Sequence, residues 1–192
     1  MKYRFLILPV LSLLCFWSCK PKTGIKKEGF FPVLSFIKSQ VAHVDTSLYS
    51  IKKITYRDSV HTDTEYIPRE NFGVQAKDFT DLPDIAARKY INRYTEEKLF
   101  DQSMNKVILT YTAVNPDEEE IQNEEVLINP DVTGDKVTSI IIDYIMSNKE
   151  EYVEKKLLWQ ADQSFTVTTI SQKPAKPETT QIVKVTWNEK EE

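Results

Sequence analysis

The chain of 192 residues contains few of the residue types on which common active sites depend, with four glycines, two histidines and two cysteines. The glycines are scattered along the chain, so there is neither a glycine-rich phosphate-binding loop nor a dinucleotide-binding fingerprint. No serine occupies a nucleophile elbow of the glycine-serine-glycine type. The sequence therefore excludes nucleotide-dependent enzymes and gives little support to a serine hydrolase.

The chain also lacks an apolar run long enough for a transmembrane helix, which needs about 20 residues. Its one extended apolar run, Phe5 to Trp17, follows Lys2 and Arg4 and is broken only by Pro9, Ser12 and Cys15. A basic segment followed by a short apolar segment is the layout of an export signal. We therefore expect residues 1 to 18 to be a signal peptide.

The end of this run, Phe16-Trp17-Ser18-Cys19, resembles the lipobox of bacterial lipoproteins. In that family, signal cleavage requires a small residue before the cysteine that receives the diacylglycerol, and Ser18 meets this requirement. Cys15 is a poorer candidate because bulky Leu14 precedes it. The resemblance implies cleavage between Ser18 and Cys19 and lipidation of Cys19, including a palmitate chain. The alternative is an ordinary secretory signal followed by a free or paired cysteine.

Lipidation has consequences for the rest of the chain. One cysteine is lost with the signal and the other is lipidated, so we expect neither disulfides nor a cysteine nucleophile. The 174 remaining residues suit one domain, which we place at residues 30 to 192. Removal of Lys2 and Arg4 lowers the formal charge from −4 to −6, which argues against a nucleic-acid partner.

Residues 19 to 29 read as a tether that contains four lysines, Lys20, Lys22, Lys26 and Lys27. These lysines could lie against anionic lipid headgroups or simply keep a solvated linker extended. In Bacteroidota lipoproteins the surface-export signal is an acidic cluster after the cysteine. If the resemblance extends to that group, the lysines imply a lipid-anchored envelope protein that faces the periplasm.

The first half of the folded part is predicted to be mainly helical, over about residues 30 to 101. Apolar residues at helical spacing predict an amphipathic helix from Pro32 to Val44. Two strands, 48 to 57 and 61 to 67, could form a hairpin. A second helix is expected to begin near Asp81 and to run toward Phe100.

From Lys106 onward the apolar pattern has a period of two, which is typical of strands. We expect five or six strands, at about 106 to 114, 125 to 128, 136 to 146, 152 to 161, 165 to 171 and 181 to 187. Their short links require antiparallel pairing, because parallel strands need crossovers of a dozen or more residues. The predicted fold class is α+β, with N-terminal helices packed on a curved antiparallel meander.

Candidate metal ligands are few. His61, Asp63 and Glu65 alternate along a predicted strand and could bind a divalent ion, although the same pattern fits a solvated face. The acids of 117 to 120, with Glu124 and Glu125, lack the spacing and glycine of a calcium loop and are expected to be a solvated loop. For residues 129 to 135 we expect a β-turn. The sequence thus predicts no cofactor.

Five aromatic residues fall on the predicted sheet, namely Tyr144, Tyr152, Trp159, Phe165 and Trp187. On one concave face they could line a pocket for an apolar ligand, whereas between the sheet and the helices they would be ordinary core. The lipobox, the tether and the α+β body together resemble small lipoproteins of Bacteroidota cell envelopes.

Three functions remain open. The leading hypothesis is a non-enzymatic envelope lipoprotein that is anchored in the bilayer through Cys19 and binds a protein partner or supports an assembly. The second is a periplasmic carrier for a lipid or another apolar ligand. The third is a carboxylate- or metal-dependent hydrolase, which would require His61, Asp63 or the acids of 117 to 125 to converge in a cleft.

Overall fold

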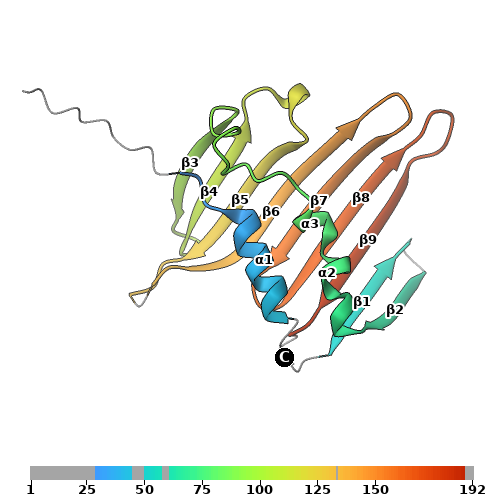
Figure 1. Ribbon diagram of the computed structural model, residues 1–192, viewed down its shortest axis with the longest axis horizontal. Coiled ribbons are helices and arrows are strands. Elements are labelled where there is room, and N and C mark those ends of the chain that lie inside the picture. The colour runs from blue at the N-terminus through green and yellow to red at the C-terminus, as the bar shows by residue number, and fades with distance from the viewer. Residues whose placement is uncertain (1–28, 45–49, 58–60, 133, 189–192) are drawn as a thin grey trace, which may run out of the picture.

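The computed structural model describes residues 29–44, 50–57, 61–132 and 134–188, which form an α+β fold with one open antiparallel sheet of nine strands (Figure 1). The strands are β1 (Ile51–Tyr56), β2 (Thr62–Ile67), β3 (Tyr94–Asp101), β4 (Lys106–Ala113), β5 (Ile121–Asn129), β6 (Lys136–Ser147), β7 (Tyr152–Gln160), β8 (Ser164–Gln172) and β9 (Thr179–Thr186). The α-helices are α1 (Val33–Val44), α2 (Phe72–Gln75) and α3 (Lys77–Thr80), and two short 3₁₀-helices are η1 (Arg69–Asn71) and η2 (Pro116–Glu118). None of the helices in these segments is both long and apolar enough to cross a membrane.

The strand order is β2-β1-β9-β8-β7-β6-β5-β4-β3, so the first and the last strand along the chain, β1 and β9, are neighbours in the sheet. The β1–β2 hairpin forms one edge, and the chain then crosses the face of the sheet through α2, α3 and residues 81–93 to reach β3 at the other edge (Figure 1). From β3 a meander returns strand by strand until β9 pairs with β1. All pairs are antiparallel, as short links require.

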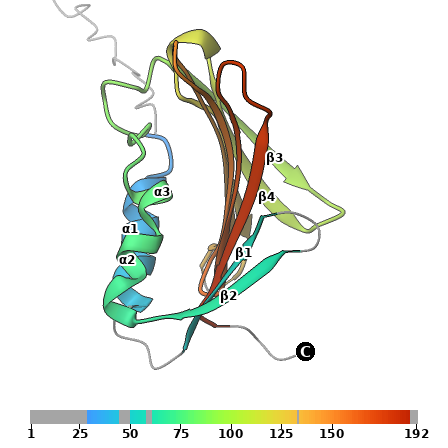
Figure 2. The same ribbon diagram turned by 90° about the vertical axis from the view of Figure 1, so that its right-hand side faces the viewer.

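The sheet curves around the helices, which lie together on its concave side (Figure 2). Helix α1 turns Val33, Ile37 and Val44 into the core, as its helical apolar spacing predicts. Two hydrogen bonds link α1 and the residues just before it to the sheet layer. The Phe31 backbone N–H donates to the Tyr111 hydroxyl over 2.9 Å. The Asp162 backbone N–H donates to Gln40 Oε1 over 2.8 Å.

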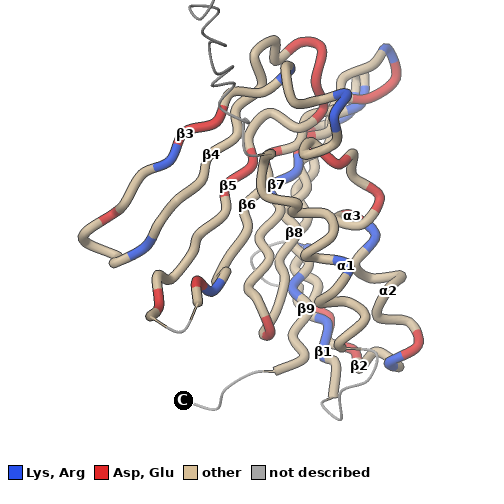
Figure 3. Tube along the Cα trace, turned by 60° about the vertical axis from the view of Figure 1, so that its left-hand side comes forward, with Lys and Arg blue, Asp and Glu red and all other residues tan. Residues whose placement is uncertain are grey.

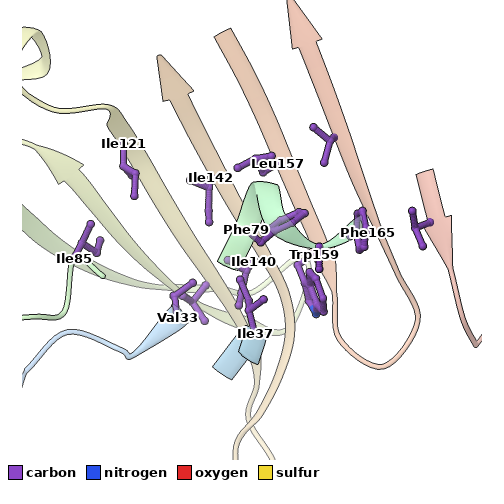
Figure 4. Packing of buried hydrophobic residues seen from close by; sticks show 14 of the residues in the cluster. Val33, Ile37, Phe79, Ile85, Ile121, Ile140, Ile142, Leu157, Trp159 and Phe165 are labelled. Atoms are coloured by element: carbon purple, nitrogen blue, oxygen red, sulfur yellow. The ribbon is translucent and has the colours of Figure 1, made fainter. Parts of the chain in front are cut away.

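The core lies between the sheet and the helices (Figure 4). Strand side chains alternate between the two faces, so β6 contributes Ile140 and Ile142 and β7 contributes Leu157 and Trp159. Phe79 of α3 packs over the strands in the same view. Burial of such side chains supplies the main favourable term in folding.

Several sequence predictions are confirmed. The α+β class and the antiparallel meander are present, and the predicted helix from Pro32 to Val44 matches α1. The predicted hairpin matches β1 and β2. All six strands predicted after Lys106 match β4 to β9, although β5 starts earlier, at Ile121.

The predicted number of strands in the sheet, five or six, is wrong because three more join it. The β1–β2 hairpin belongs to the same sheet, since β1 pairs with β9. The third addition is β3, which lies where the sequence predicted a helix up to Phe100. Residues 94 to 101 contain good helix formers, but backbone pairing with β4 along the whole strand overrides that local preference.

The expected helix beginning near Asp81 is also wrong. Residues 84 to 93 instead form successive turns, in which the N–H groups of Ala87, Tyr90 and Arg93 each donate to the carbonyl three residues earlier. Asp84 Oδ1 accepts the Ala86 N–H over 3.1 Å, which closes an Asx turn. The apolar spacing that suggested a helix serves instead to place Ile85 in the core.

Candidate functional site

The five aromatic residues considered for an apolar pocket lie in different parts of the fold. Trp159, Phe165 and Trp187 are almost fully buried. They pack against Phe72 of α2 and Phe79 of α3, with the Phe72–Trp187 and Phe79–Trp159 ring centroids 5.0 and 5.1 Å apart. These three residues therefore lie in the core beneath the short helices.

The two tyrosines lie elsewhere. Tyr152 belongs to the convex face, where its hydroxyl donates to Glu154 Oε2 over 3.2 Å. Tyr144 is half-buried and borders a groove beside α3, with the Lys155 ammonium 5.8 Å from its ring centroid. Burial and the carboxylate of Glu120 raise the pKa of Tyr144.

The candidate metal ligands His61, Asp63 and Glu65 lie on or next to β2, which is an edge strand of the sheet. His61 precedes β2, and Asp63 and Glu65 are exposed on it. The Glu65 carboxylate forms an ion pair of 2.8 Å with Lys53 of β1. The alternating residues Thr62, Thr64 and Tyr66 are exposed as well, and β2 is an edge strand of the sheet. Within the described segments, no group of three or more His, Cys, Asp or Glu side chains is arranged to hold a metal ion.

The acidic segment differs from the solvated loop that the sequence suggested, because two of its members are buried. The first is Glu119, whose carboxylate forms an ion pair with the Arg93 guanidinium. The Tyr94 hydroxyl donates to Glu119 Oε2 over 3.4 Å and to the Ile121 carbonyl over 3.0 Å. This arrangement connects the start of β3 to the start of β5, and the Arg93 cation compensates the negative charge of Glu119.

The second buried acid is Glu124 of β5, which is 2% exposed and belongs to the concave face. Its Oε1 atom is buried without a hydrogen-bond partner among the described residues. Burial, and to a lesser extent the nearby carboxylate of Asp84, raise the pKa of Glu124 to about 8. An uncompensated buried carboxylate is costly, so Glu124 favours its protonated form.

Glu124 lines a small cavity between the sheet and the helices, of about 10 Å³, close to the space that one water molecule needs. Its walls are the apolar side chains of Val33, Leu34, Ile37, Phe79, Leu82, Pro83, Ile85 and Ile142, together with Asp84. Figure 4 shows Val33, Ile37, Phe79, Ile85 and Ile142 as core side chains that come from several elements.

An open groove of about 270 Å³ lies next to this cavity. It is lined by Lys77, Asp78, Asp81, Leu82, Pro83, Glu120, Tyr144 and Lys155. Leu82 and Pro83 line both spaces, so the groove and the cavity adjoin at these two residues. An ion pair of 2.6 Å between Lys155 and Asp78 spans the groove from β7 to α3.

The described residues between β5 and β6 include a turn, as the sequence predicted for 129 to 135. The Gly134 N–H donates to the Asp131 carbonyl over 3.2 Å, and Gly134 has a φ of 137°, which favours glycine. Val132 in this turn is fully exposed. The predicted signal peptide, the predicted cleavage and lipidation site at Ser18 and Cys19, and most of the predicted tether lie outside the described residues.

Sequence reasoning named Glu124 but expected it to lie in a solvated loop, and it did not single out Asp84. A signal for Glu124 was present, because it lies two residues before Val126 on a strand and so shares the buried face of that strand. No comparable signal marked Asp84, which precedes Glu124 by 40 residues and comes near it only in the fold. Comparison of the chain with protein-family models, curated proteins and solved structures finds no match.

Proposed function

We propose that this chain is a non-enzymatic lipoprotein of the cell envelope, anchored in the bilayer through Cys19, that binds a protein partner through one end of its sheet. The observation that carries the proposal is a group of exposed apolar side chains on two adjacent hairpins. This group, the hairpin patch, consists of Leu99, Phe100, Met104 and Val132. These are four of the eight large hydrophobic side chains that are exposed in the described residues.

The two hairpins lie side by side at one end of the sheet (Figure 1). Strand β4 pairs with both β3 and β5, and Val107 faces Ile128 close to the two turns. Leu99, Phe100 and Met104 are 54, 48 and 47% exposed. Leu99 and Phe100 are consecutive on β3, so this end of the sheet exposes apolar side chains on both faces, which favours contact with another macromolecule.

The β3 edge offers a second means of contact. In the described sheet β3 has a neighbour, β4, on one side only. Its outer backbone N–H and carbonyl groups can therefore accept a strand of another chain, with Leu99 on one face and Phe100 on the other. Backbone pairing would supply affinity, and the two apolar side chains would supply selectivity.

The charges around the hairpin patch favour a protein over a lipid surface. Lys98, Asp101, Lys106, Asp135 and Lys136 lie close in sequence to the hairpin patch residues, and the tube shows both signs of charge on the two hairpins (Figure 3). An apolar centre with a polar rim is the usual anatomy of a protein interface. An anionic membrane surface would favour a mainly basic rim instead.

The positions of the candidate catalytic groups support the non-enzymatic part of the proposal. Glu119 is neutralised by Arg93, and Glu65 is paired with Lys53 at the far edge of the sheet. His61 and Asp63 belong to that same edge, whereas the acids of 117 to 125 adjoin β5. A hydrolytic site built from these groups would need them in one cleft.

The partner proposal is tested by site-specific photo-crosslinking of the full chain in its native envelope. A benzophenone side chain is placed at Leu99, and in a second variant at Val74 of α2, which is 55% exposed and serves as the matched control. We expect one defined protein adduct from position 99 and none from position 74. Leu99→Asp should abolish co-purification of that protein, whereas Val74→Asp should preserve it. Equal adducts at both positions, or lipid adducts alone, would contradict the proposal.

The anchor is tested separately through Cys19→Ser. We expect this variant to lose labelling by tritiated palmitate and to leave the membrane fraction, because no other cysteine remains in the mature chain. Unchanged labelling would contradict the anchor without bearing on the hairpin patch.

A further inference from the structure

We propose that Glu124 is the buried anchor of a binding site for a small organic cation, an ammonium group on a short apolar chain, which enters from the groove beside α3. This inference is independent of the hairpin patch, which lies on other residues. It rests on the unpartnered carboxyl of Glu124, the cavity that this carboxyl lines and the groove that adjoins the cavity.

The carboxyl provides the polar end of the site. Glu124 is 2% exposed and its Oε1 atom has no hydrogen-bond partner in the part of the chain that the structure describes. Asp84, on the segment that crosses the sheet, is close enough to act on Glu124 electrostatically. Two neighbouring acids in an apolar wall favour a ligand that brings positive charge and N–H donors.

The walls provide the apolar part of the site. Eight of the ten residues that line the cavity are apolar, and they come from α1, α3, the crossing segment and β6. An alkyl group would contact these walls while its ammonium group reached the carboxyl. Ligand sites commonly combine an apolar lining with a few convergent polar groups in this way.

The proposed route passes Leu82 and Pro83, the two residues that line both the cavity and the groove. Both belong to a segment outside helices and strands, so no backbone ladder holds them against the sheet. Displacement of these two side chains would join the groove of about 270 Å³ to the carboxyl. The joined space approaches the lower end of the range for small-molecule sites, roughly 300 Å³.

The groove favours cations as well. Its acids are Asp78, Asp81 and Glu120, and its bases are Lys77 and Lys155. Lys155 is paired with Asp78, which leaves an excess of negative charge along the route to Glu124. A cation is thus attracted both at the entrance and at the end of the site.

Binding would be coupled to proton release. The titratable groups that interact electrostatically with Glu124 are Asp84 on the crossing segment, Tyr94 on β3 and Tyr111 on β4. The Glu124 O–H bond breaks as the ammonium group arrives, the proton passes to buffer, and the carboxylate stays paired with the cation. Affinity should therefore rise as the pH rises from 5 to 8.

The probe is n-butylammonium, titrated calorimetrically into the full chain in a mild non-ionic detergent at pH 7, in phosphate and in Tris. The difference in heat between the two buffers measures the protons released. We expect binding with release of close to one proton, and at least about tenfold weaker binding of n-butanol, which lacks the charge.

Two variants separate the site from the fold. Glu124→Gln should weaken n-butylammonium binding about tenfold or more and abolish proton release. Its matched control is Glu125→Gln, the next residue on the same strand but on the opposite face, which should bind like the wild type. Near-ultraviolet circular dichroism confirms that both variants remain folded.

Three results would overturn the proposal: no binding of n-butylammonium to the folded chain, equal binding of n-butanol, or wild-type binding by Glu124→Gln. None of these results would bear on the partner proposal, because position 124 is buried and distant in sequence from the hairpin patch residues of β3.

Discussion

The indole ring of Trp159 stacks on the phenyl ring of Phe165, with ring centroids 5.4 Å apart and planes inclined by 16°. The two residues face each other on β7 and β8. Phe79 of α3 meets both rings edge-on, with centroids 5.1 and 5.3 Å away. This aromatic group connects the helical layer to the sheet.

We expect Phe79→Ala to destabilise the fold by roughly 3 to 5 kcal/mol, because it removes a fully buried ring and leaves a cavity. Urea unfolding followed by tryptophan fluorescence measures the change, since Trp159 and Trp187 both lie in this core. Val74→Ala on the neighbouring helix is the control, and its exposed side chain should cost less than about 0.5 kcal/mol. Equal losses would show that α3 is not packed as described.

Glu124 makes stability depend on pH. Its pKa in the folded state, about 8, lies above the ordinary value of 4.5. Between these two values the folded state binds more protons than the unfolded state, so stability is fully present below about pH 4.5 and falls as the pH rises through 8.

We expect Glu124 alone to reduce the free energy of unfolding by roughly 3 kcal/mol between pH 5 and pH 8. In Glu124→Gln this loss should disappear, so the variant should gain stability over the wild type at pH 8 and little at pH 5. Chemical unfolding at the two pH values measures both. If the free energy of unfolding had the same pH dependence in the wild type and in Glu124→Gln, Glu124 would be ionised in the folded state or would lie outside the core.

Two ion pairs should differ in their energetic weight. Arg93→Met would leave the Glu119 carboxylate, whose side chain is 6% exposed, without its cation, and we expect a loss of about 1 to 3 kcal/mol. Asp78→Asn removes the partner of Lys155, but Asp78 is 39% exposed and the expected loss is below about 1 kcal/mol. Thermal unfolding of the two variants side by side makes the comparison. A larger loss for Asp78→Asn would reverse this assignment.

Two glycine substitutions should act in opposite directions. Gly134 has a φ of 137°, where any side chain is strained, so Gly134→Ala should cost about 1 to 3 kcal/mol. Gly73 lies in α2, and an added Cβ would meet Val41 at an ordinary 3.9 Å. Gly73→Ala should therefore stabilise the protein by up to about 1 kcal/mol, and melting temperatures would record the two signs.

Alternation and turn chemistry were sufficient to predict much of the fold. The period of two after Lys106 located six strands, and the apolar stripe from Val33 to Val44 located α1. Both patterns are local, because a half-buried strand or helix must show its burial in its own residues. The lipid anchor at Cys19 likewise rests on a local motif and stays a prediction.

What the sequence could not decide depends on partners that are distant along the chain. Residues 94 to 101 have a helical composition and become β3 only because β4 offers a complete ladder of hydrogen bonds. The β1–β2 hairpin joins the main sheet through β9, more than 120 residues later. Glu124 and Asp84 meet only because the crossing segment passes over β5. The sequence by itself determined which segments bury one face, because the apolar residues of a segment show which of its faces is buried. The tertiary structure decided which buried faces meet, because strand pairing and helix packing depend on residues that are distant along the chain.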